Sequence, residues 1–168
     1  TYLVPNIKAS YISARLEYYF SGKTNLVRSI AFERTFYSPL TKWAGGVFLG
    51  QMITELTFIQ HDSLCHLFSN TDLQDYWAAW SWKLYKGNSV EARTTNLILS
   101  GRVLVIKYPG RPVESEAANV FNSQTIYFAG LGFTSRKFVR DRYVFDYGKV
   151  EDVPIGRAIG LTAGLDIQ

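Results

Sequence analysis

The chain has 168 residues, of which 15% are aromatic and 19% charged, and its formal net charge is +4. This length fits one domain, spanning 1–168, that can bury a core without metal or disulfide support. One cysteine excludes an internal disulfide, and one cysteine with two histidines is too few for an ordinary zinc site, so we expect no metal and no cofactor. The basic residues are scattered along the chain, which predicts no nucleic-acid partner.

Two-residue periodicity and turn residues predict strands at roughly 7–20, 25–37, 43–59, 74–86, 93–108, 123–138 and 155–168, with a short piece near 142–147. The predicted connections alternate between short ones, SGKTN and SPLTK, and long ones, HDSLCHLFSNTD and PGRPVESEAANVFN. This alternation is typical of outer-membrane barrels. No stretch approaches the ~18 consecutive apolar residues of a membrane helix, but a transmembrane strand needs only ~9–11 residues.

The last predicted strand, PIGRAIGLTAGLDIQ, separates most clearly into two faces. Its odd positions carry Ile159, Leu161 and Leu165, whereas its even positions carry Gly160 and Gly164. In a soluble sheet the face opposite the aliphatic one meets water and should be rich in charged and polar residues, not glycine. In a membrane barrel the aliphatic face meets lipid, and small or polar residues point into the lumen.

We therefore predict an all-β, antiparallel transmembrane β-barrel, or part of one, with about seven or eight strands, in the bacterial outer membrane. Outer-membrane lipid is the expected partner of the aliphatic side chains. The predicted lumen-lining residues are Arg15, Glu17, Arg102, Arg136, Gly160 and Gly164, and the predicted lipid-facing residues are Ile159, Leu161 and Leu165. Aromatic residues near the predicted strand ends, such as Tyr76 and Trp77, are interpreted as an interfacial girdle.

Two polar segments are candidates for chemistry. The segment QHDSLCH gathers His61, Ser63, Cys65 and His66 in a predicted loop, which would suit a nucleophile and base in a small barrel enzyme acting on lipid. Such residues gather often by chance in a polar loop, so we expect a surface connection and no catalytic residue.

The second polar segment is RDRYVFDYGKVEDVPIG. We predict that 140–154 folds back over or into the barrel, because its charges cannot face lipid and Pro154 cannot donate to a strand ladder. In this hypothesis arginines pair with nearby carboxylates. The residues of these predicted ion pairs are Arg140, Arg142, Asp146, Glu151 and Asp152.

The segments FERTFYSPLTKWAGGVFLGQ at 32–51 and FTSRKFVRDRYVFDYGKVEDVPIGRAIGLTAGLD at 133–166 resemble the barrel region of the outer-membrane protein assembly factor and bacterial surface antigen superfamily, in its Bacteroidota form. The resemblance implies a larger barrel behind periplasmic domains that inserts or translocates other polypeptides without catalysis. Client polypeptides and further barrel subunits are the partners it implies. The arginine-glycine lid-loop signature of that superfamily is absent; IGRAIG at 155–160 does not match it.

The main hypothesis is thus a non-enzymatic outer-membrane barrel, or a portion of one, that takes part in assembly, insertion or export of outer-membrane or surface polypeptides. Two alternatives stay open: a small outer-membrane barrel enzyme acting on lipid, and a soluble β-barrel that binds an apolar ligand.

Overall fold

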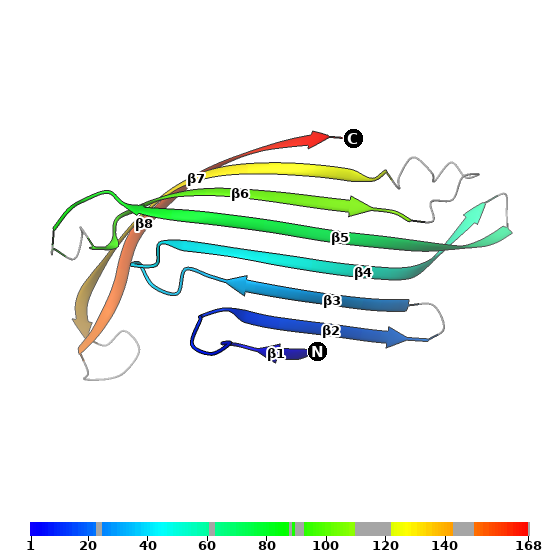
Figure 1. Ribbon diagram of the computed structural model, residues 1–168, viewed down its shortest axis with the longest axis horizontal. Helices are drawn as coiled ribbons and strands as arrows, with labels where there is room; N and C mark the ends of the chain where they lie inside the picture. The colour runs from blue at the N-terminus through cyan, green and yellow to red at the C-terminus, as the bar shows by residue number, and fades with distance from the viewer. Residues whose placement is uncertain are drawn as a thin grey trace.

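The computed structural model describes residues 1–22, 25–60, 63–87, 89, 93–109, 122–142 and 150–167. Within these ranges the chain forms one antiparallel sheet of eight strands in sequence order, which confirms the all-β prediction (Figure 1). The strands are β1 (Tyr2–Val4), β2 (Ser13–Ser21), β3 (Asn25–Arg34), β4 (Trp43–Gln60), β5 (Ser63–Lys83), β6 (Asn96–Lys107), β7 (Gln124–Arg142) and β8 (Val150–Ile167).

The first strands differ from the prediction in a way that backbone geometry explains. The predicted strand at 7–20 begins only at Ser13, because Lys8, Ala9 and Tyr11 have φ values of 46°, 58° and 60°. Such left-handed conformations interrupt an extended strand. The short strand β1, which the sequence analysis did not predict, pairs with β2 through Tyr2 and Leu16.

The hairpin of β4 and β5 replaces the predicted long loop after residue 59. Gln60 pairs with Ser63, so the polar run from 63 to 73 belongs to β5 instead of a loop. That prediction was wrong because polar side chains do not exclude a strand when a neighbouring strand satisfies its backbone hydrogen bonds. Tyr76 and Trp77 consequently lie inside β5 and not at its end.

The hairpin of β7 and β8 also corrects a prediction. Residues 140–142 end β7 and residues 150–154 begin β8, so 140–154 is not one folded-back loop. Arg140 lies opposite Asp152 in the register, Arg142 lies opposite Val150, and Glu151 lies opposite Asp141. Asp146 is outside the described residues, and the side chains of 136–142 and 150–154 are not described.

Pro154 lies within β8, opposite Phe138. The inability of Pro154 to donate to a ladder was used to predict a folded-back loop, and the structure nevertheless places this residue in a strand. In an antiparallel pair only alternate residues exchange hydrogen bonds, and a strand with one partner leaves its other N–H groups unused. Among the described residues β8 pairs with β7 alone, so the strand tolerates a proline at such a position.

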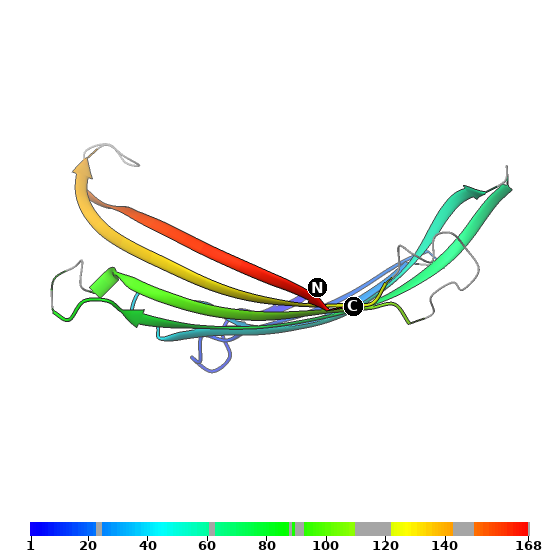
Figure 2. The ribbon, with the colours of Figure 1, turned by 90° about the horizontal axis from the view of Figure 1, so that it is seen from above.

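The sheet is open and bowed along its strands. Its two edges are β1 and β8, and no pairing within the described ranges joins them into a closed barrel. Figure 2 shows a trough in which the β4–β5 hairpin and the β7–β8 hairpin turn up at opposite ends. Beyond Ile53 in β4 and Asp72 in β5, these two strands pair with each other and with no third described strand, so they form a two-stranded extension.

The described residues have almost no hydrophobic core. Buried hydrophobic side chains are limited there to Ala44 and Ala79, and no described element forms a second layer over the sheet. Among the described residues, no helix is long and apolar enough to cross a membrane.

Candidate functional site

The strand register divides the sheet into two faces of different chemistry. Directly paired residues share a face, and successive residues in a strand alternate between faces. The register places five predicted lumen-lining positions on one face, called here the mixed face: Arg15, Glu17, Arg102, Gly160 and Gly164. Arg136 lies opposite Gly156 in the register, and its side chain is not described. The opposite face, called here the aliphatic face, carries Ile159, Leu161 and Leu165.

Large exposed hydrophobic side chains gather on the aliphatic face. Of the strand residues in this class, the mixed face carries Leu3, Tyr19 and Met52. The aliphatic face carries Tyr2, Leu16, Tyr18, Phe20, Phe32, Trp43, Val47, Leu49, Phe68, Tyr76, Trp80, Trp82, Leu99, Tyr127, Leu131, Ile155, Ile159, Leu161, Leu165 and Ile167. Leu161 is 76% exposed. Exposed apolar surfaces of this extent are typical of proteins that contact a membrane or a partner.

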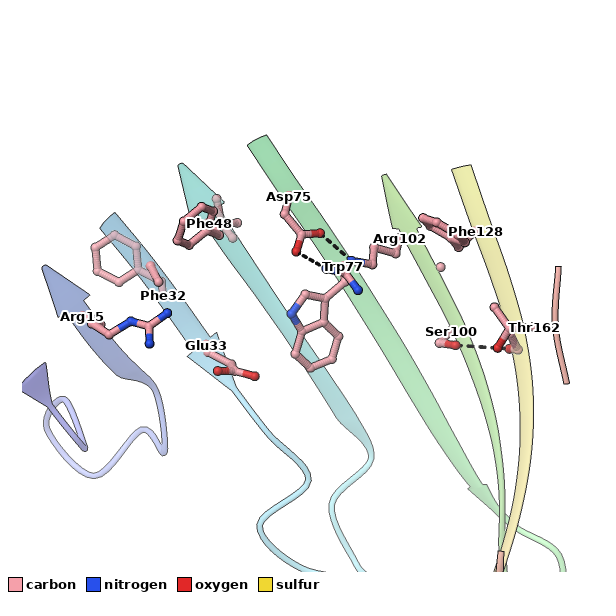
Figure 3. Close-up of a pocket in the computed structure, with 14 residues that line it drawn as sticks. Arg15, Phe32, Glu33, Phe48, Asp75, Trp77, Ser100, Arg102, Phe128 and Thr162 are labelled. Carbon is pink, nitrogen blue, oxygen red and sulfur yellow. Dashed lines mark hydrogen bonds and ion pairs between the residues drawn. The ribbon is translucent and has the colours of Figure 1, made fainter. Parts of the chain in front are cut away.

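A hollow of about 650 Å³ lies on the mixed face and spans β2 to β8 (Figure 3). Arg15 and Glu33 enter it from one side, and Ser100 and Thr162 line the other. Asp75 and Arg102 lie between them. Charged, hydroxyl and aromatic groups thus share one water-accessible surface.

The central ion pair of this hollow joins neighbouring strands. Arg102 donates from Nε to Asp75 Oδ1 at 2.7 Å and from Nη2 to Asp75 Oδ2 at 2.6 Å. This fork geometry fixes both side chains. The Asp75 side chain is 14% exposed and that of Arg102 is 51% exposed, so the pair remains accessible to water.

Three aromatic rings of the mixed face lie over glycines. A Cβ added to Gly46 would come 2.5 Å from Trp77 Nε1, and one added to Gly50 would come 2.8 Å from a Phe48 ring carbon. Phe128 similarly lies 3.0 Å from a Cβ at Gly164. Glycine therefore lets these rings lie flat along the sheet, as aromatic side chains do over glycine in other sheets.

Sequence reasoning missed this arrangement at the hollow. The predicted strand beginning at 74 included Asp75 and Trp77, but Trp77 was interpreted as part of a girdle near a strand end. Trp77 lies opposite Gly46 and Phe128 opposite Gly164. A search for aromatic residues that alternate with small residues could have found Phe128, whereas its glycine partner depends on the register.

At one end of the aliphatic face, basic and aromatic groups combine. The Arg34 guanidinium lies 3.8 Å from the Trp43 ring centroid and donates from Nη1 to the Trp43 carbonyl oxygen at 2.7 Å. It also lies 5.2 Å from the Tyr37 ring, which stacks on Tyr11 at 3.8 Å between centroids. Such clusters suit a membrane interface, where rings meet lipid and charges meet water.

At the other end, a polar network crosses three strands of the same face. Arg28 donates from Nε to Gln51 Oε1 at 2.7 Å, and Gln51 donates from Nε2 to Asp72 Oδ1 at 2.9 Å. Polar or cationic groups therefore interrupt the aliphatic face toward both ends of the strands, and exposed Phe20 and Phe68 lie beyond the Arg28 network.

The candidate nucleophiles of QHDSLCH do not form a loop. Ser63, Cys65 and His66 instead belong to strand β5. His61 and Asp62 lie outside the described residues. Where residues are described, no group of three or more histidine, cysteine, aspartate or glutamate residues is arranged to hold a metal ion.

No protein-family model, curated protein sequence or solved structure matches the chain.

Proposed function

We propose that the chain forms the wall of an outer-membrane β-barrel, with its aliphatic face against lipid and its mixed face lining an aqueous lumen. The proposed activity is non-enzymatic: the barrel takes part in the assembly, insertion or export of outer-membrane or surface polypeptides. The separation of the two faces carries the proposal, because exposed large hydrophobic side chains gather on one face while the charged hollow lies on the other.

A soluble sheet would use these faces differently. Its aliphatic face would pack against a second layer, and here no described element covers it. The water-facing side of a soluble sheet has no structural requirement for aromatic rings that lie over Gly46 and Gly164. In a lumen, flat rings leave the passage open while they pack against the backbone. The faces therefore fit a barrel wall better than a soluble core.

Tryptophans on opposite faces of one strand provide a direct test. Trp80 lies on the aliphatic face of β5, and Trp77 lies on the mixed face three residues earlier. Variants of the whole chain retain one of these tryptophans and replace the other three by phenylalanine. In vesicles with brominated acyl chains, we expect strong fluorescence quenching of Trp80 and weak quenching of Trp77. Aqueous iodide should show the reverse preference.

Each outcome of the quenching experiment is informative. Equal quenching of Trp77 and Trp80 by brominated lipid would contradict the assignment of the two faces. Quenching of neither, with a monodisperse protein in the absence of detergent, would favour the soluble ligand-binding barrel.

The assembly role has a separate test. We expect vesicles containing the whole chain to accelerate folding of a urea-unfolded outer-membrane barrel, monitored by its resistance to added protease. Vesicles with an unrelated barrel at the same protein-to-lipid ratio provide the control. Equal folding rates in the two preparations would remove the assembly role and leave the barrel wall untouched.

A further inference from the structure

We propose that Arg28, Gln51 and Asp72 form a headgroup site for a phospholipid, with phosphatidylethanolamine as its ligand; this inference rests on the proposed contact of the aliphatic face with lipid. The site lies where β3, β4 and β5 pass side by side. It borders a shallow hollow of about 610 Å³ on the aliphatic face.

The network fixes a guanidinium beside the aliphatic surface. Gln51 receives the Arg28 Nε–H at 2.7 Å, and among the described residues the terminal nitrogens of Arg28 donate to no other group. Arg28 is exposed, as is Tyr18, which lies directly opposite it in β2. A phosphate diester accepts hydrogen bonds from guanidinium nitrogens in this geometry.

The carboxylate of Asp72 lies one strand beyond Gln51, the residue that accepts the Arg28 hydrogen bond. Gln51 donates from Nε2 to Asp72 Oδ1 at 2.9 Å, and Asp72 Oδ2 accepts no hydrogen bond from a described residue. Strands lie about 4.8 Å apart, so the backbones at Arg28 and Asp72 are separated by about 10 Å. The phosphate and ammonium of phosphatidylethanolamine carry charges opposite to those of Arg28 and Asp72, and a two-carbon link joins them. Exposed Lys107 lies opposite Asp72 in β6 and adds a cation on the far side of the carboxylate.

The same hollow continues into an apolar surface. Ile30 and Leu49 are paired in the next row of the register, and Leu16 extends this row into β2. Acyl chains can therefore lie on aliphatic side chains while the headgroup reaches Arg28. A free phosphate ion would make the polar contacts with Arg28 but no contacts with the aliphatic side chains.

Mass spectrometry of the intact protein released from detergent micelles tests the site. We expect phosphatidylethanolamine to remain bound to the wild-type chain, and Arg28→Gln to weaken this binding about ten-fold, as loss of a charged hydrogen bond would. The matched control is Arg15→Gln, which removes an exposed arginine from the mixed face and should leave binding unchanged. Arg28→Lys should retain part of the affinity.

Competition and headgroup comparisons complete the experiment. The proposal is overturned if Arg28→Gln and Arg15→Gln bind lipid alike, if inorganic phosphate or glycerophosphoethanolamine competes as well as the lipid, or if phosphatidylglycerol binds more tightly than phosphatidylethanolamine. Tryptophan quenching by brominated lipid does not depend on Arg28. Loss of the headgroup preference with intact Trp80 quenching therefore contradicts this site alone, whereas loss of Trp80 quenching contradicts the barrel wall.

Discussion

Gly46 is a position at which an added methyl group would collide with an aromatic ring. A Cβ there would lie 2.5 Å from Trp77 Nε1 and 3.2 Å from the Phe32 carbonyl oxygen, so the indole must move. We expect Gly46→Ala to lower the free energy of unfolding by roughly 1–3 kcal/mol, measured by urea titration in micelles. Gly160→Ala is the matched control, because its Cβ would lie 3.9 Å from the nearest atom, the Leu131 carbonyl oxygen.

A double-mutant cycle connects the effect to the indole. If Trp77 causes the cost, Gly46→Ala should be nearly harmless in a Trp77→Ala background. An unchanged cost in that background would show that the backbone of β4 resists the methyl group instead.

Leu161 and Thr162 test the two faces with neighbouring residues. Leu161 is 76% exposed on the aliphatic face, and Thr162 lines the hollow of the mixed face. We expect Leu161→Arg to destabilise the chain folded in vesicles by ~2–4 kcal/mol if the residue lies near the bilayer midplane, since a buried guanidinium loses its water. Thr162→Arg should cost much less. Comparable losses from both variants would disagree with lipid on one face.

At the scale of elements, the β4–β5 hairpin is the informative one. From Thr54 to Gln60 and from Ser63 to Thr71 its strands pair with each other and with no third described strand. A two-stranded ribbon is marginally stable in water. We expect backbone amides at 56–60 to exchange with deuterium at least ten-fold faster than those at 45–50, which lie between two strands. Equal protection would indicate that another chain or element covers the ribbon.

Periodicity was sufficient to predict the faces of the long strands, because alternation is a local property of the backbone. Arg15, Arg102 and Gly160 come from distant strands, yet the register places them on one face. The start of β5 could not be predicted in this way. Its first residues have no consistent alternation, and polar residues after Ser63 look like a loop unless the partner strand is known.

The candidate site was predicted only in part, because its key contacts depend on register. Asp75 lies opposite Leu104 and bonds diagonally to Arg102, a relation that no spacing within one strand reveals. Trp77 over Gly46 is another such relation. Glycines were predicted from the sequence as small lumen-lining residues, but the aromatic rings that lie over them are apparent only when neighbouring strands are aligned.

For the whole molecule, the exposed aliphatic face predicts behaviour in solution. Apolar surfaces of this extent associate in water. We expect the chain to form large assemblies in detergent-free buffer and a single narrow species in micelles, measured by light scattering after size-exclusion chromatography. A monodisperse monomer without detergent would contradict the proposed wall.

The register also shears the sheet, and this shear has a geometric consequence. The row of partners that starts at Leu16 in β2 passes Leu49 in β4 and ends at Ile167, the last residue of β8. A stagger in one direction means that strands in a closed barrel must incline to its axis, typically by 35–45°. In the proposed wall the bilayer surface would then cross the rows of paired residues obliquely, and each strand would traverse the hydrocarbon on a slant longer than the membrane is thick.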